Sequence, residues 1–96
     1  MSKQSLDFQK YLEGQLKNSE FKKHFDEYGK QLEIAYLILQ LRKKRKMSQK
    51  VLAKKIGATQ SNVARMEAGK QNLTTDTLNK IALAFDCELK VDFIEN

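Results

Sequence analysis

The stretch that decides the fold runs from Ser48 to Gly69 and reads SQKVLAKKIGATQSNVARMEAG. Ser48 and Thr59 belong to the residue types that cap helix N-termini, so each predicts the start of a short helix. Gly57 separates the two helices, because glycine adopts the backbone conformation that a tight turn requires. Gly69 ends the second helix. Two short helices joined in this way form a helix-turn-helix unit.

Apolar and polar side chains alternate in this stretch with the period of a helix. The apolar set is expected to face the core and comprises Leu52, Ala53, Ile56, Val63 and Met66. The outward set gathers at the start of the second helix and comprises Thr59, Gln60, Ser61, Asn62 and Arg65. Amide side chains suit the adenine edge in the major groove of DNA, and arginine suits guanine or phosphate.

Helical periodicity continues on both sides of the stretch. Residues 4–17 place Phe8, Tyr11, Leu12 and Leu16 on one helical face. Ser19 is expected to cap a second helical stretch, which Gly29 interrupts. Residues 31–44 are apolar almost all round, which predicts a helix covered on two sides. Downstream, Thr74 caps a last helix that buries Leu78, Ile81, Ala82 and Phe85.

The C-terminal segment changes to a period of two. Leu89, Val91 and Phe93 alternate with charged residues, which predicts a strand within residues 87–96. A lone strand leaves its backbone polar groups unpaired, and nothing else in the chain has a strand pattern. The economical partner is the same strand of a second copy, which gives a two-fold dimer. The alternative is a frayed tail.

Length and composition bound the class of protein. The 96 residues suit one domain, and 41% are apolar while 31% are charged. The single cysteine, Cys87, cannot form an internal disulfide, which fits a reducing cytosol. The longest apolar run, residues 34–39, is too short to cross a membrane, and the N-terminus lacks a signal-peptide pattern. We therefore expect a cytoplasmic protein.

The charge is concentrated at the centre of the chain. The net charge is +6, and all eight cations of residues 31–58 lie between Arg42 and Lys55. Such a block attracts polyanions, of which nucleic acid is the first candidate, although a solvated helix face has the same composition. The adjacent helix-turn-helix pattern favours contacts with phosphate groups.

Residues 37–85 resemble helix-turn-helix domains of the XRE (Cro and phage-repressor) type. The segments that carry the resemblance are Leu41-Arg42-Lys43, Met47-Ser48-Gln49, Leu52-Ala53, Ile56-Gly57, Thr59-Gln60-Ser61, Val63-Ala64-Arg65-Met66-Glu67, Gly69-Lys70, and Leu78 with Ile81-Ala82. The resemblance implies an all-α, lambda-repressor-like bundle, here with an N-terminal helical extension and a short C-terminal β-strand. It also implies an internal salt bridge between Arg42 and Glu67.

The same resemblance assigns DNA contacts to residues of this chain. The residues expected to read bases are Gln60, Ser61 and Asn62. The residues expected to contact phosphates are Gln49, Lys43, Thr59, Arg65 and Lys70. A dimer would present two recognition helices to a pseudo-palindromic double-stranded operator. The expected function is sequence-specific repression of transcription, with a nonspecific nucleic-acid binder as a weaker alternative.

Two additions to the domain resemble small antitoxins of the HigA type, which neutralise RelE/HigB-like ribonuclease toxins and repress their own operon. The additions are an extension over residues 1–30 before the domain at 31–86, and a tail over 87–96. Candidate contacts with a toxin are Phe8, Tyr11, Leu12, Phe21 and Phe25. These side chains have core packing as an alternative role, and a stand-alone regulator could carry the same additions.

The sequence offers no catalytic site. His24 is the only histidine and Cys87 lies 63 residues away, so no metal site is expected. The acidic neighbours of Cys87 make its thiol a poor nucleophile. No phosphate-cradling glycine loop or catalytic triad has supporting context. We expect neither an enzyme nor a cofactor.

Overall fold

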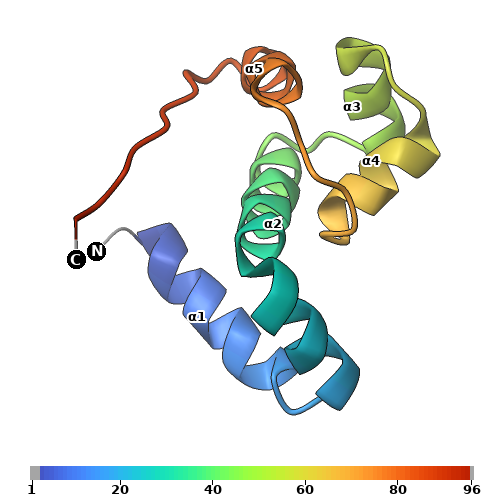
Figure 1. The fold of residues 1–96 in the computed structure, drawn as a ribbon. Coiled ribbons are helices and arrows are strands. Elements are labelled where there is room, and N and C mark those ends of the chain that lie inside the picture. The colour runs from blue at the N-terminus through green and yellow to red at the C-terminus, as the bar shows by residue number, and fades with distance from the viewer. Residues whose placement is uncertain (1–2, 96) are drawn as a thin grey trace.

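The computed structural model describes residues 3–95, with the side chains of residues 3–7, 21, 24, 25 and 27 outside the description. Phe21 and Phe25, two of the candidate toxin contacts, and His24 therefore lie outside the described side chains. Over this range the chain forms α1 (Lys3–Gln15), α2 (Ser19–Lys44), α3 (Gln49–Ile56), α4 (Gln60–Glu67) and α5 (Thr75–Ala84) (Figure 1). The expected helical bundle is confirmed.

The long helix α2 organises the molecule, with α3, α4 and α5 grouped around its C-terminal half and α1 beside its N-terminal half (Figure 1). α3 packs against α4 and α5, α4 also packs against α2, and α1 packs against α2. α2 therefore crosses the boundary expected at residue 30 and joins the N-terminal extension to the helix-turn-helix.

The core lies among α2, α3, α4 and α5. Its buried members are Ile38, Leu52, Ala53, Ile56, Val63, Met66, Ile81 and Phe85. All five inward-facing residues expected in the central stretch are among them. Burial of one such large aliphatic side chain stabilises the fold by roughly 1.5–3 kcal/mol. α3 and α4 are held mainly by this shared underside.

α2 begins and bends at residues other than those expected. The N-cap is Asn18, whose Oδ1 accepts a hydrogen bond from the Glu20 backbone N–H at 2.9 Å. The expectation of a Ser19 cap was wrong by one residue, because asparagine serves this position equally well. The interruption lies at Tyr28, where φ is −134° and ψ is 34°, one residue before Gly29.

Four helices end in the same kind of turn. The left-handed residues are Lys46, Gly57, Gly69 and Asp86, with φ of 54°, 71°, 70° and 56°. After each, a backbone N–H returns to the carbonyl five residues earlier, joining residues 47 to 42, 58 to 53, 70 to 65 and 87 to 82. This Schellman pattern pairs carbonyls that a helix end otherwise leaves exposed. Glycine signals only two of the four turns.

Three aromatic rings attach α1 to α2. The ring of Tyr36 on α2 lies 5.3 Å from that of Phe8 and 5.1 Å from that of Tyr11, centroid to centroid. Phe8 is buried in this cluster, whereas Tyr11 remains 39% exposed. Of the candidate toxin contacts on α1, Phe8 is thus used for packing within the chain, while Tyr11 and the half-buried Leu12 are more accessible.

The described residues of the single chain contain no strand, so the expected C-terminal strand is not supported. Residues 88–95 run away from α5 as an extended segment without strand pairing (Figure 1). The physical reason is the lack of a partner, because a strand exists only as part of a hydrogen-bonded ladder and residues 3–87 supply no second strand. Leu89, Val91 and Phe93 keep the alternating pattern without the ladder.

Gly69 is the point at which the end of α4 meets α2. A Cβ atom at this position would lie 2.5 Å from Cδ2, 3.2 Å from Cγ and 3.3 Å from Cα of Leu32. Gly57 has nearly the same φ, but a Cβ there would meet nothing within 4 Å. Both positions therefore need a residue that tolerates positive φ, whereas only position 69 also lacks room for a Cβ atom.

We expect Gly69→Ala to lower the free energy of unfolding by about 2–4 kcal/mol, through left-handed strain and the clash with Leu32. Gly57→Ala is the matched control, and its loss should be about 1–2 kcal/mol because only the backbone strain applies. Urea denaturation measures both. Equal losses in the two variants would contradict the close approach of Gly69 to α2.

Candidate nucleic-acid interface

The start of α4 is held in place by its cap and by its underside. Thr59 Oγ1 accepts a hydrogen bond from the Asn62 backbone N–H at 3.1 Å, which fixes the first turn. Val63 and Met66 anchor the opposite face in the core. Around them, Thr59, Gln60, Ser61 and Arg65 are exposed and Asn62 is half-buried. A polar surface therefore stands on a rigid apolar support.

An ion pair joins the end of α2 to the end of α4. Arg42 Nε donates to Glu67 Oε2 at 2.6 Å, and Arg42 Nη2 donates to Glu67 Oε1 at 3.0 Å. The third donor, Arg42 Nη1, binds the carbonyl of Met47 at 2.9 Å. The side chains are only 14% and 5% exposed, so solvent screens the pair weakly. Arg42 is thereby occupied inside the fold.

The hydrogen bond that Arg42 donates to Glu67 raises the pKa of Arg42 above its ordinary value, while burial opposes the shift and the charge of Glu67 supports it. A raised folded-state pKa gives stability that is complete below the unfolded-state pKa and is lost only as pH rises through the folded-state value. Both values lie far above neutrality. The charge of Arg42 is therefore constant through the neutral range.

Gln49 belongs to the same network. Its Nε2 donates to Glu67 Oε1 at 3.0 Å, which ties the first residue of α3 to the last residue of α4. The side chain is half-buried, and its amide nitrogen carries a second N–H that this bond leaves available. Gln49 is thus held in one orientation beside α4, at one end of the surface expected to contact DNA.

The basic run over residues 42–46 divides into two roles. Arg45 Nε donates to the Phe85 carbonyl at 3.0 Å and Nη2 lies 3.6 Å from Cys87 Sγ, so Arg45 secures the end of α5. A guanidinium at a helix C-terminus also complements the helix dipole. The charge pattern alone did not signal this role. Lys43, Lys44 and Lys46 remain exposed.

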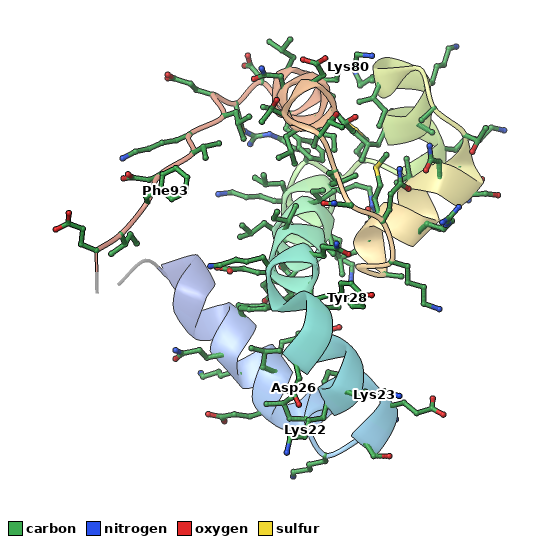
Figure 2. All side chains as sticks on the ribbon, in the orientation of Figure 1. Lys22, Lys23, Asp26, Tyr28, Lys80 and Phe93 are labelled. Atoms are coloured by element: carbon green, nitrogen blue, oxygen red, sulfur yellow. The ribbon has the colours of Figure 1, made fainter. Side chains whose placement is uncertain are left out.

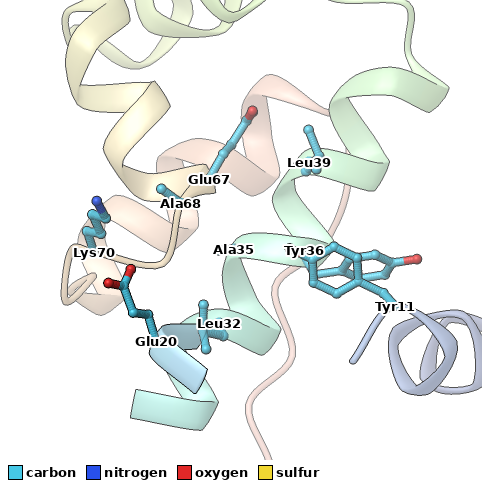
Figure 3. Close-up of a pocket in the computed structure, with 9 residues that line it drawn as sticks. All are labelled: Tyr11, Glu20, Leu32, Ala35, Tyr36, Leu39, Glu67, Ala68 and Lys70. Atoms are coloured by element: carbon cyan, nitrogen blue, oxygen red, sulfur yellow. The ribbon is translucent and has the colours of Figure 1, made fainter. Parts of the chain in front are cut away.

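A groove of about 380 Å³ lies between the N-terminal extension and the end of α4 (Figure 3). Its lining residues are Tyr11, Glu20, Leu32, Ala35, Tyr36, Leu39, Glu67, Ala68 and Lys70. Tyr11, a candidate partner contact, and Lys70, a candidate phosphate contact in the loop after α4, line opposite sides of this groove (Figure 3). Sequence reasoning did not foresee this arrangement, because it depends on the tertiary packing of α1 and α4 against α2.

Residues 38–91 match a protein-family model described as Helix-turn-helix, which covers more than half of the chain. The fold and the match define the class, and the chain belongs to the XRE-type helix-turn-helix family of DNA-binding regulatory domains. No curated protein and no solved structure matches the chain in the corresponding comparisons. None of the helices in the described residues has the length and apolar character needed to span a membrane.

We expect Glu67→Gln to lower the free energy of unfolding by about 2–4 kcal/mol, because Arg42 would keep its charge in a site with little solvent. The control is Glu33→Gln, which removes the exposed Lys30–Glu33 pair of 3.0 Å on α2. That change should cost less than about 0.5 kcal/mol. Thermal or urea unfolding compares the two variants, and similar small losses in both would show that the Arg42–Glu67 pair does not hold the helices together.

Proposed function

We propose that this protein is a sequence-specific transcription regulator that represses genes by binding a pseudo-palindromic operator as a homodimer. Membership of the DNA-binding helix-turn-helix family supports the coarser part of the proposal. The observation that carries the finer part is the exposed polar start of α4 above a buried apolar underside. In helix-turn-helix proteins the N-terminal residues of the second motif helix contact base edges in the major groove.

The proposed base contacts come from Gln60, Ser61 and Asn62. Gln60 and Ser61 are exposed, whereas Asn62 is half-buried and has the more restricted reach. The Gln60 amide offers a donor and an acceptor together, which fits the N6/N7 edge of adenine.

The proposed phosphate contacts come from residues that flank the base-reading surface. Lys43, Arg65 and Lys70 are exposed cations. Thr59 Oγ1 already accepts one hydrogen bond, and its hydroxyl hydrogen remains able to donate to a phosphate oxygen. The second N–H of Gln49 can do the same, with Glu67 fixing the amide. Contacts of this kind set register and orientation rather than sequence preference.

A finer proposal is that the protein is also an antitoxin for a RelE/HigB-like ribonuclease, with a stand-alone regulator as the alternative. The resemblance of the additions supports it, as does the accessible Tyr11 beside the groove. Deletion of the extension is a poor test, because it would uncover Tyr36, which α1 now covers. A substitution of Tyr11 by lysine removes one ring contact with Tyr36 but keeps α1 and the contact between Phe8 and Tyr36. The proposal requires this variant to weaken neutralisation while DNA affinity is kept.

We expect Gln60→Ala to reduce the preference for the operator over random DNA by about 1–3 kcal/mol, because one bidentate base contact is lost. Gln9→Ala, the same substitution at an exposed site on α1, should leave that preference unchanged. Competition binding with operator and random duplexes measures the ratio. An unchanged ratio for Gln60→Ala would overturn the base-reading assignment.

We expect Lys70→Ala to weaken operator and random duplexes by similar factors, since phosphate contacts carry no sequence information. The slope of log affinity against log salt should become shallower by about 0.9 for one lost phosphate contact. Lys10→Ala removes the same charge from the exposed surface of α1 and serves as the control. Identical salt slopes for the two variants would place Lys70 away from the DNA backbone.

A further inference from the structure

The C-terminal tail, residues 87–95, presents apolar side chains and an open backbone. Val91, Phe93 and Ile94 are 65%, 95% and 89% exposed, and Figure 2 shows Phe93 on the tail beyond the helices. Within the described residues, the last backbone-to-backbone hydrogen bond of the chain is from the Cys87 N–H to the Ala82 carbonyl, at 2.8 Å. The backbone of the extended segment 88–95 makes no hydrogen bond to another helix or strand among the described residues, and the Phe93 N–H donates only to the neighbouring Asp92 Oδ1 at 2.8 Å, so the segment is accessible to a strand partner.

The tail has one mainly apolar face and one mainly charged face. Odd-numbered positions from 87 to 93 are apolar, and even-numbered positions from 86 to 92 are charged. When two identical strands pair in antiparallel orientation, the numbers of any two residues that face each other add up to the same value. This sum identifies the register of the pair. An even sum places odd positions opposite odd positions and so keeps Leu89, Val91 and Phe93 on one face, with Ile94 on the other face, whereas an odd sum mixes the faces.

The charged residues distinguish the registers that have an even sum. A sum of 180 opposes Lys90 to the partner's Lys90 and Glu88 to the partner's Asp92, and a sum of 184 opposes Asp92 to the partner's Asp92. Like charges directly opposite each other destabilise a ladder. A sum of 182 opposes Lys90 to the partner's Asp92, twice by symmetry. It also opposes Leu89 to the partner's Phe93 and Val91 to itself.

The length of the ladder favours the same register. A sum of 178 also opposes Glu88 to the partner's Lys90, but it sets Asp86 against the partner's Asp92. It would also pair only residues 87–91 of the tail, because Asp86 already has the left-handed conformation of the α5 terminus. A sum of 182 sets all of residues 87–95 opposite one another, with Glu88 facing the partner's Ile94 and Cys87 facing the partner's Glu95 at the two ends. The register with both complementary charges and full pairing is therefore the one centred on Val91.

We propose that two copies of this chain join their tails as an antiparallel ribbon with Val91 on the two-fold axis and Lys90 opposite the partner's Asp92. This inference deepens the homodimer in the proposed function and rests on it. We take the partner of the tail to be the tail of a second copy, because the Lys90 and Asp92 positions of two identical tails complement each other. An isologous two-fold contact requires such self-complementarity. The ribbon gives the segment the ladder that it lacks in one chain.

The first test exchanges the charges. In a homodimer of the Lys90→Asp variant, or of the Asp92→Lys variant, positions 90 and 92 place like charges opposite each other. Each substitution should therefore weaken self-association about tenfold or more. An equimolar mixture of the two full-length variants restores opposite charges at both positions and should form a heterodimer close to wild-type strength. Sedimentation equilibrium at low salt, without DNA, measures all three. A mixture no stronger than its components would overturn the register.

The second test locates the axis. In a Cys87→Ser background, single cysteines are placed at positions 90, 91 and 92, which lie on the axis for sums of 180, 182 and 184. The residue on the axis faces its own copy within the Cα separation that a disulfide requires. Val91→Cys should therefore form intermolecular disulfides fastest under mild oxidation. Faster formation at position 90 or 92 would overturn the proposal.

The outcomes separate this inference from the proposed function. A dimer that is indifferent to the charge exchange would overturn the register and leave the homodimer standing. Monomers at all concentrations, and in the presence of operator, would overturn both the ribbon and the homodimer. Neither result changes the base-reading test on Gln60, which is measured as a ratio of two affinities.

Discussion

The carboxylate of Glu67 is the constraint on which the arrangement of the helix-turn-helix depends. It accepts two hydrogen bonds from Arg42 at the end of α2 and one from Gln49 at the start of α3. Three helices are thereby fixed relative to one another by a single buried group. The apolar core brings these helices together, but apolar packing is only weakly directional. The hydrogen bonds of this network are directional, so they fix the orientation of α4 relative to α2 and α3.

The sequence is most informative where one residue type answers one local physical requirement. Ser48, Thr59 and Thr74 were expected to cap helices, and each accepts the hydrogen bond of an N-cap. Gly57 and Gly69 were expected at helix ends, and both have positive φ. The buried face of residues 48–69 could be predicted from the helical period of its apolar residues alone. For this reason the exposed residues of α4 could be predicted before its position was known, except that Asn62 is half-buried.

The sequence is least informative where the requirement comes from tertiary packing. Lys46 adopts a left-handed conformation that its residue type does not signal, and Asp86 adopts one that aspartate signals only weakly. Arg45 binds a carbonyl 40 residues away, and nothing within the basic run distinguishes it from its neighbours. The bend in α2 is an intermediate case, because it lies at Tyr28, one residue before the Gly29 at which an interruption was expected. The tail is the extreme case, since its alternating pattern predicts a strand and the described residues of the single chain supply no second strand to pair with it.

The brevity of α4 has a consequence for how the molecule opens. An isolated helix of eight residues does not persist in water, because nucleation costs more than two turns can return. α4 therefore owes its existence to Thr59 at one end, Glu67 at the other and the core beneath. Its amide hydrogens should exchange with solvent through the opening of the whole helix bundle rather than by local fraying. The duplex would then meet a preformed element, with no ordering entropy left to lose.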